Sequence, residues 1–341
     1  MKKNIITLAI TLIIILSLVE LSIRIYLPQD LSSSFRMYGN NGLLLNKKNS
    51  KATHYYKERK IKYTFGKFHE RSYDLLKKEK KVLILGDSFT FGWLVSDKNT
   101  FVYKLDKNFD QYTFVNASAG GWGTSDQLRY LIDFCERIKP LYIINIINFL
   151  DFERVKNSNL FYLDKNDNLT IGSNPISKMK KVSENSFYKF LIENYHTLNY
   201  LKKKYLEIFI HNKSTKNNNN DQIKVKDSKT QIKLINKNKN YNLIKKVYKK
   251  MKLETEKCGS NLFVINLSWE DFKNYDALNF LKFNYSFFKN NEINFIELYD
   301  KMKFIRDNKS DYVIAGEGHP NEKANEFIYE ILKDEIENII K

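Results

Sequence analysis

Five short apolar runs, separated by stretches with helical periodicity, constrain the fold of this 341-residue chain more than any other feature. Each run is almost free of charge, which is typical of strands buried on both faces of a parallel sheet. The runs cover residues 82–85, 112–115, 141–149, 262–267 and 293–298, and the helical patterns cover 124–138, 186–209, 240–256, 273–288 and 321–340. Strands that alternate with helices predict an α/β fold in which helices cover both faces of a mostly parallel sheet.

The N-terminus predicts a membrane anchor over residues 1–28. An uncharged run from Ile5 to Val19 continues in apolar character to Pro28, and a spanning helix needs about 20 residues. Arg24 lies near the far end, where its side chain can reach the headgroups. Lys2 and Lys3 favour a cytoplasmic N-terminus and an extracytoplasmic remainder. A cleaved signal peptide is the main alternative, although no Ala-x-Ala-like site follows, and a buried core helix is the third.

The net charge of +18 is concentrated in two segments. Residues 47–81 carry +9 and residues 201–257 carry +12, so the rest of the chain is slightly acidic. We expect residues 29–79 to form a basic stalk leading into a domain over 80–341, with a solvated or disordered Lys/Asn-rich insertion near 211–239. Export weighs against a nucleic-acid partner and favours anionic lipid headgroups or acidic glycans near the anchor.

Few residues suggest a metal or a cofactor. Two cysteines, Cys135 and Cys258, exclude a disulfide-dense scaffold and a multi-cysteine metal site, and their default interpretation is core or surface thiols. The sequence has no metal-ligand spacing, no Walker loop and no dinucleotide fingerprint, so we expect no cofactor and no metal.

Three short stretches beside the expected strands carry chemistry. Gly86-Asp87-Ser88 follows the first strand, at the sheet edge where α/β folds bind ligands. A glycine-rich loop over 115–124 follows the second strand and can bring backbone N–H groups close to a ligand. His319 lies between Gly318 and Pro320, just before the last helix, with a carboxylate two residues away. Taken singly, each stretch is at least as often a structural turn or a helix cap as a site of chemistry.

Together, in this order, the three stretches resemble the SGNH/GDSL hydrolase superfamily over about residues 60–340. The resemblance implies a three-layer α/β/α, flavodoxin-like sandwich. It implies that Ser88 is the nucleophile and that the backbone N–H groups of Ser88 and Gly121 form part of an oxyanion hole. It also implies that His319 accepts the serine proton, since a serine hydroxyl is a poor nucleophile without such a base.

Two positions depart from the family pattern. The triad acid usually stands three residues before the histidine, where this chain has Gly316, so we assign Glu317 as the acid that orients the ring. The third block, Gly-x-Asn-Asp, corresponds to Asn148-Phe149-Leu150-Asp151, so Leu150 replaces the oxyanion asparagine and Asn148 is the candidate substitute. Loss of one oxyanion donor lowers the rate by a factor of about 10² to 10³.

The resemblance implies an exported serine esterase that acts on O-acyl, mainly acetyl, esters of carbohydrate. Two alternatives remain open at this point. The chain could be an O-acetyltransferase of a cell-surface polysaccharide, working beside a membrane-embedded acyl donor protein. It could also be an inactive glycan-binding protein that keeps the fold. Trp93 and Trp122 are candidates for stacking against sugar rings, with ordinary packing as the simpler interpretation.

Overall fold

The computed structural model describes residues 2–71, 78–172, 182, 184–218, 226–268, 283 and 285–341. These residues fall into two compact units. The smaller unit comprises Met1–Ser34, Ala52–Lys60 and Ser177–Lys233, and the larger comprises Phe35–Lys51, Ile61–Ile176 and Leu234–Lys341. The expected helix over 273–288 lies mostly outside the described residues.

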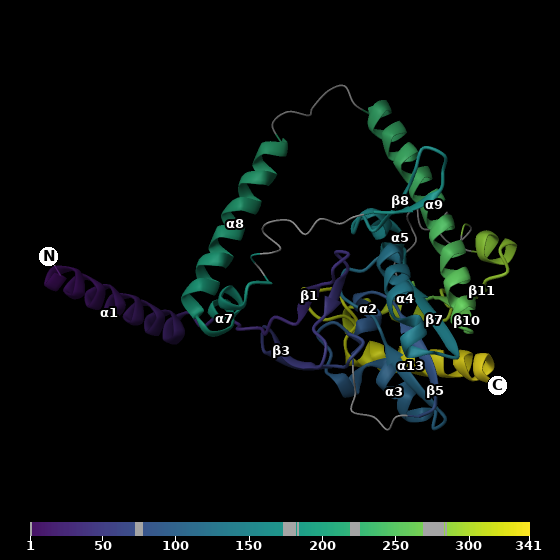
Figure 1. Ribbon diagram of the computed structural model, residues 1–341, viewed down its shortest axis with the longest axis horizontal. Coiled ribbons are helices and arrows are strands. Elements are labelled where there is room, and N and C mark those ends of the chain that lie inside the picture. Colours follow the sequence, from purple (N-terminus) through teal and green to yellow (C-terminus); the bar gives the residue numbers. More distant parts are fainter. Residues whose placement is uncertain are drawn as a thin grey trace. The chain divides into compact units, whose positions relative to one another are not determined.

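A five-stranded parallel sheet forms the centre of the larger unit (Figure 1). Its strands are β5 (Lys80–Leu85), β6 (Tyr112–Asn116), β7 (Tyr142–Ile147), β10 (Asn261–Asn266) and β11 (Asn294–Glu297). They lie in the order β11-β10-β7-β5-β6, which is the order of the flavodoxin-like doubly wound fold. All five apolar runs are therefore strands, as the sequence predicts.

Helices cover both faces of this sheet, so the predicted three-layer α/β/α architecture is confirmed. Alternate residues of β5 point to opposite faces. Leu83 and Leu85 belong to one core with α4 (Thr124–Ile138) and the C-terminal half of α9 (Lys226–Lys257). Val82 and Ile84 belong to a second core with α3 (Phe101–Asn108) and α13 (Glu322–Ile340). Burial on both sides explains why these strands are continuously apolar rather than alternating.

The chain also contains shorter elements. Six of them pair in two-stranded sheets: β1 with β2 and β8 with β9, both antiparallel, and β3 with β4. The remaining strands are β1 (Arg36–Tyr38), β2 (Leu44–Asn46), β3 (Ser50–Tyr56), β4 (Arg59–Phe65), β8 (Phe161–Leu163) and β9 (Leu169–Ile171). The short helices are α2 (Ser88–Phe91), η1 (Asp97–Asn99), α5 (Phe149–Glu153), η2 (Arg154–Lys156), α11 (Lys303–Asp307) and α12 (Lys309–Tyr312).

Part of the expected stalk packs in the same unit as the sheet. Phe35 and Phe65 are buried, and their rings stack with the ring of Phe91, which ends α2. Arg71 is buried as well. The basic composition of residues 29–79 hides this packing, because its aromatic residues are interspersed with lysines on the exposed sides of the strands.

The Lys/Asn-rich segment differs from the expected loop where the structure describes it. Residues 211–218 continue helix α8 (His196–Asn218), and residues 226–239 belong to α9. Lysine is a good helix former, and the buried face of α9 from Leu243 to Met251 gives that helix its packing.

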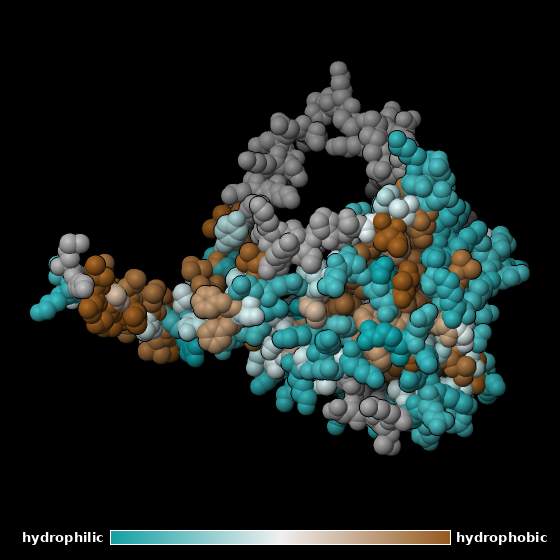
Figure 2. Space-filling view, in the orientation of Figure 1, coloured by the Kyte–Doolittle hydropathy of each residue, from teal (hydrophilic) through white to brown (hydrophobic). Residues whose placement is uncertain are grey.

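The N-terminal residues form one long helix, α1 (Lys2–Tyr26), whose surface is almost entirely apolar (Figure 2). Lys3–Tyr26 has the length and composition to cross a membrane, with a mean hydropathy of 2.5, and none of it is buried within the described structure. A signal sequence passes the same test. The smaller unit also contains α7 (Ser186–Asn194) and α8, which the sequence predicts as one helical stretch over 186–209.

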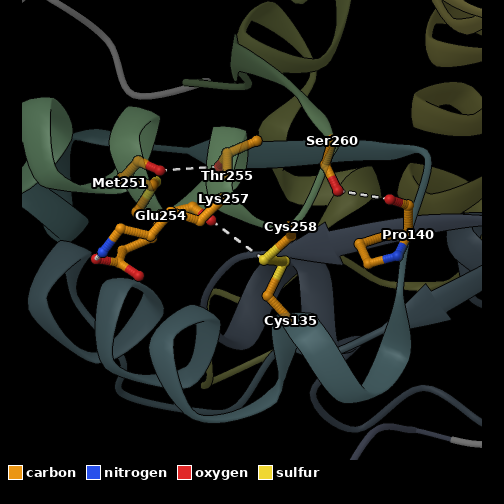
Figure 3. The surroundings of a disulfide bond; sticks show 8 residues. All are labelled: Cys135, Pro140, Met251, Glu254, Thr255, Lys257, Cys258 and Ser260. Carbon is orange, nitrogen blue, oxygen red and sulfur yellow. Dashed lines mark hydrogen bonds and ion pairs between the residues drawn. A yellow bond between two sulfur atoms is a disulfide. The ribbon is translucent and has the colours of Figure 1, made fainter.

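A disulfide joins Cys135 near the end of α4 to Cys258 just after α9 (Figure 3). The two Cα atoms lie 6.1 Å apart, within the usual range for such a bond, and 123 residues separate the two positions. Close by, the Ser260 hydroxyl donates a hydrogen bond of 2.5 Å to the Pro140 carbonyl. The default interpretation of two free thiols is therefore wrong, since sequence spacing cannot reveal that these two helix ends meet.

Candidate active site

Ser88 is the first residue of α2, immediately beyond the carboxyl end of β5. The preceding turn needs Gly86, because a side chain there would lie 2.2 Å from Thr90 Oγ1. Asp87 caps the helix, with Oδ1 accepting a hydrogen bond of 2.8 Å from the Phe89 N–H. The other oxygen of this buried carboxylate lies 3.2 Å from Arg154 Nη1. These contacts fix the turn that carries Ser88, which is 4% exposed.

A buried guanidinium, that of Arg71, holds the chain directly after this turn. It donates hydrogen bonds to the carbonyls of Phe91, Gly92 and Val95, at 2.6, 2.8 and 2.5 Å, and to Asp97 Oδ1 at 2.7 Å. Gly92 is required here on two counts: its φ is +76°, and a side chain would meet Arg71 Nη1 at 2.8 Å. Nothing in the local sequence around Arg71 identifies this role, because its acceptors lie 20 to 26 residues away.

His319 lies in a tight turn between α12 and α13. Val313 bridges to Pro320, and the Ile314 N–H donates to the His319 carbonyl at 2.8 Å. The turn uses left-handed backbone at Gly316 (φ +82°) and Gly318 (φ +74°). Gly316 occupies the usual position of the triad acid, and Glu317 is the next residue in the turn.

The structure brings the three residues proposed for the triad together. His319 Nε2 lies 3.0 Å from Ser88 Oγ, and His319 Nδ1 lies 3.0 Å from Glu317 Oε2. With the proton assigned to Nδ1, the imidazole donates to Glu317 and accepts from the serine hydroxyl. The side chains of His319 and Glu317 are 21% and 28% exposed, so the base is reachable from solvent while Ser88 is nearly buried. This geometry allows proton transfer from the hydroxyl to the ring.

Gly121 lies in the loop after β6, at the same sheet edge as Ser88. Ile84 of β5 pairs with Asn116 of β6, so the two following segments leave the sheet side by side. Gly121 has a φ of +84° and open space where a side chain would be. The loop is fixed at its far end, where buried Asp126 Oδ2 accepts from the Gly123 N–H at 3.0 Å. Burial raises the pKa of Asp126 to about 6, against the opposing effect of this hydrogen bond.

Asn148 leaves the sheet on the other side of β5, since Leu85 pairs with Asn145 of β7. It caps α5: Asn148 Oδ1 accepts from the Leu150 N–H at 2.8 Å, and its own N–H donates to Asp151 Oδ2 at 2.9 Å. The carbonyl oxygen of the amide is therefore engaged in the cap, and the Nδ2 group is the donor that the side chain can offer. Leu150 is the second residue of α5 and is partly exposed.

A buried polar network lies behind this cap. The Tyr248 hydroxyl donates to Asn145 Oδ1 at 2.8 Å, Asn145 Nδ2 donates to Gln127 Oε1 at 2.9 Å, and Gln127 Nε2 lies 3.4 Å from Asp151 Oδ1. Burial raises the pKa of Tyr248 well above its ordinary value, and the nearby Asp151 carboxylate adds to this effect. The network connects α9, β7 and α4 to the position of Asn148.

Aromatic rings flank the histidine. The Phe89 ring meets the His319 ring edge-on at 5.5 Å, and the Trp93 ring centroid lies 6.1 Å from that of His319. Arg36 packs its guanidinium 4.7 Å from the Trp93 ring, and a side chain at Gly120 would meet Arg36 Nη2 at 2.5 Å. Burial lowers the pKa of Arg36 from its ordinary value. Trp93 is therefore a wall of the site, whereas Trp122 is buried, with Nε1 donating to the Leu44 carbonyl at 2.6 Å.

The part of the chain that the structure describes contains no group of three or more His, Cys, Asp or Glu residues able to hold a metal ion.

No protein-family model and no curated protein matches the sequence. Several solved structures are similar in fold. An esterase, EstA, from Pseudoalteromonas sp. is 14% identical with a TM-score of 0.42, and the match covers 77% of this chain and 99% of that one. A lipase/acylhydrolase from Enterococcus faecalis is 12% identical with a TM-score of 0.42, covering 77% and 97%. An acetyl xylan esterase, AlAXEase, is 12% identical with a TM-score of 0.41, covering 75% and 99%. At such values the activity of this chain has to be inferred from its own site.

Proposed function

We propose that this chain is a membrane-anchored, extracytoplasmic serine esterase that acts through an acyl-Ser88 intermediate. One observation carries the proposal: His319 lies within hydrogen-bond distance of both Ser88 and Glu317, at 3.0 Å on each side of the ring. A nucleophile, a base and a group that orients the base are the minimum needed for acyl transfer by serine.

The proposed reaction has two half-steps. His319 Nε2 takes the Ser88 proton while Oγ attacks the ester carbonyl, and the resulting imidazolium is stabilised by the Glu317 carboxylate. The oxyanion receives hydrogen bonds from the N–H groups of Ser88 and Gly121 and from Asn148 Nδ2. The tetrahedral intermediate expels the alcohol, which takes the proton from His319. Water then attacks the acyl-serine, with His319 again accepting and returning a proton, and releases the acid.

The proposed substrate is an O-acyl ester of carbohydrate. Trp93 is partly exposed and places an aromatic ring beside His319, where a sugar ring bound next to the reacting atoms could pack against the part that Arg36 leaves uncovered. Transfer of the acyl group to a sugar hydroxyl would use the same first half-step, with the hydroxyl in place of water. Product analysis with an added sugar acceptor separates the two: free acid alone supports the esterase, and an acylated sugar supports the transferase.

Hydrolysis of p-nitrophenyl acetate by the full chain tests the proposal. We expect turnover that falls to background in Ser88→Ala and in His319→Ala. Ser96→Ala is the matched control, because this serine makes no side-chain capping bond at the start of η1. A fluorophosphonate probe should label the native chain and the control, but not Ser88→Ala. Equal turnover in all four proteins, with no labelling, would refute the esterase and leave an inactive glycan-binding protein as the better interpretation.

The membrane and extracytoplasmic parts of the proposal have separate support. The helix α1 is apolar over a length that can span a bilayer, and its first two residues are lysines. The disulfide between Cys135 and Cys258 fits an oxidising compartment. Protease treatment of intact and of lysed cells tests this topology: the larger unit should be accessible from outside the cytoplasmic membrane.

A further inference from the structure

Helices α7 and α8 present large apolar side chains to solvent. Phe187 on α7 is 69% exposed, and Leu201, Tyr205 and Ile208 on α8 are 56%, 64% and 61% exposed. The helices that cover the sheet behave in the opposite way, since α3, α4 and α13 bury their apolar faces. A helix in water normally turns such a face toward a core, so these side chains point to an environment other than water.

Four of the five exposed large apolar residues described on α8 form one face, and the fifth, Leu206, which is 45% exposed, lies beyond its Lys202 edge. Leu198, Leu201, Tyr205 and Ile208 follow each other at spacings of three and four residues, which places them along one side of the helix. Lys202 and Lys204 lie on either edge of this face, and Lys203 lies on the opposite side. An apolar face bordered by lysines is typical of a helix lying in a membrane interface, because the long side chains can extend to anionic headgroups.

The far end of α1 is bonded directly to the start of α8. Glu20 accepts hydrogen bonds from the His196 N–H at 3.0 Å, the Thr197 N–H at 2.9 Å and the Thr197 hydroxyl at 2.7 Å. Arg24 Nη2 donates to the Asn194 carbonyl, which ends α7, at 3.1 Å. The first N–H groups of a helix lack partners within it, and Glu20 supplies acceptors for two of them. Removing α1 by cleavage would leave this helix end uncapped, which favours a retained anchor.

The position of Glu20 along α1 sets the depth of α8. At 1.5 Å per residue, Glu20 lies about 26 Å from Lys3, close to the outer boundary of a hydrocarbon core of about 30 Å. A helix that begins beside Glu20 therefore begins at the level of the interface. We propose that α7 and α8 lie in the interface of the bilayer that α1 spans, with their apolar face among the acyl chains and the flanking lysines at anionic headgroups. This inference rests on the proposed membrane anchor and is independent of the esterase chemistry.

The test places a fluorescent NBD label on single cysteines in the full chain, reconstituted into vesicles of phosphatidylcholine and phosphatidylglycerol. The two natural cysteines are joined as a disulfide, so an added cysteine can be labelled selectively without reductant. Leu201→Cys and Tyr205→Cys report the apolar face, Lys203→Cys is the matched control on the opposite side, and Ile13→Cys reports insertion of α1.

We expect the labels at 201 and 205 to be quenched several-fold more by lipids with nitroxide-bearing acyl chains than the label at 203, which iodide in the water should quench. Lipid quenching at 201 and 205 should weaken in vesicles without phosphatidylglycerol. A different result would be quenching of the label at residue 13 by lipid, with the labels at 201 and 205 quenched by iodide like the label at 203. That result would support the anchor but overturn the interfacial placement of α8, in favour of a protein partner for its apolar face. If the label at residue 13 is also quenched by iodide, both the membrane anchor and the interfacial placement are refuted.

Discussion

Replacing Arg71 with methionine tests whether the turn behind Ser88 depends on a buried cation. Arg71→Met removes the donor from three carbonyls and from Asp97, while the new side chain keeps most of the volume. Breaking a buried ion pair by removing one partner costs about 3–5 kcal/mol. The Asp97 side chain is 18% exposed, so water can take over part of its hydrogen bonding, and we expect the lower end, about 3 kcal/mol.

The assay is thermal unfolding of the full chain in detergent, followed by near-ultraviolet circular dichroism. For a unit of this size, about 3 kcal/mol corresponds to a fall in Tm of about 6–12 °C. Arg71→Lys should fall in between, because one ammonium group cannot reach all four acceptors in the planar arrangement of a guanidinium. Lys62→Met is the control, since Lys62 is an exposed residue of the neighbouring strand β4. A change in Tm of less than 2 °C for Arg71→Met would refute the reasoning.

Four further predictions concern the site and its support. Asn148→Asp keeps an oxygen that can cap α5, but its carboxylate cannot donate a hydrogen bond to an oxyanion. We therefore expect kcat to fall by about 10²- to 10³-fold while Tm stays nearly unchanged. An unchanged kcat would show that Asn148 is not part of the oxyanion hole. Glu317→Gln should lower kcat on p-nitrophenyl acetate by about 5- to 10³-fold. The reason is that the attraction between the carboxylate and the imidazolium is worth about 1 kcal/mol for a fully solvated pair and about 4 kcal/mol for a partly buried one. A change in KM with kcat unaltered would contradict this role. Replacing both disulfide cysteines with serine should lower the free energy of unfolding by about 2–5 kcal/mol relative to the oxidised native chain, measured by urea denaturation. The reduced native chain should be about as stable as the serine variant, and equal stability of oxidised and reduced native protein would argue against the bond. Asp126 has a folded-state pKa raised to about 6, so the folded state binds its proton more tightly than the unfolded state does. The stability that this group contributes therefore falls as pH rises from about 4 to 6. Asp126→Asn should reduce that fall in a series of Tm values measured against pH, and an unaltered series would refute the prediction.

Much of the sheet could be predicted from the sequence because its strands are buried on both faces. That burial makes each strand a continuous apolar run, and the run is visible without knowledge of its neighbours. Helix α4 was predictable at both ends, since its amphipathic pattern begins after a glycine-rich loop and stops before Pro140. The candidate catalytic residues could be predicted from their positions next to these elements, at the ends of strands and just before the last helix.

The rest could not be predicted, since it depends on contacts between distant segments. Arg71 looks like one more cation in a basic stretch, and only the folded chain shows that it lies under the Ser88 turn. The pairing of Cys135 with Cys258 depends on two helix ends meeting across 123 residues. The expected domain start at residue 80 and the stalk over 29–79 remain predictions as boundaries, yet Phe35, Phe65 and Arg71 pack around the turn after β5.

The separation of Ser88 from His319 along the chain, 231 residues, also determines when the site can first exist. At synthesis rates of about 5–20 residues per second, the proposed base is made roughly 10 to 50 seconds after the nucleophile. The turn that carries it leads into α13, and Asn325 of that helix accepts the Phe101 N–H at the start of α3 at 3.1 Å. Under the proposed mechanism, a chain still being exported holds a serine without its proton acceptor. The chain would then become able to hydrolyse esters only at the end of its synthesis. Truncated chains that end before His319 would be inactive rather than partly active.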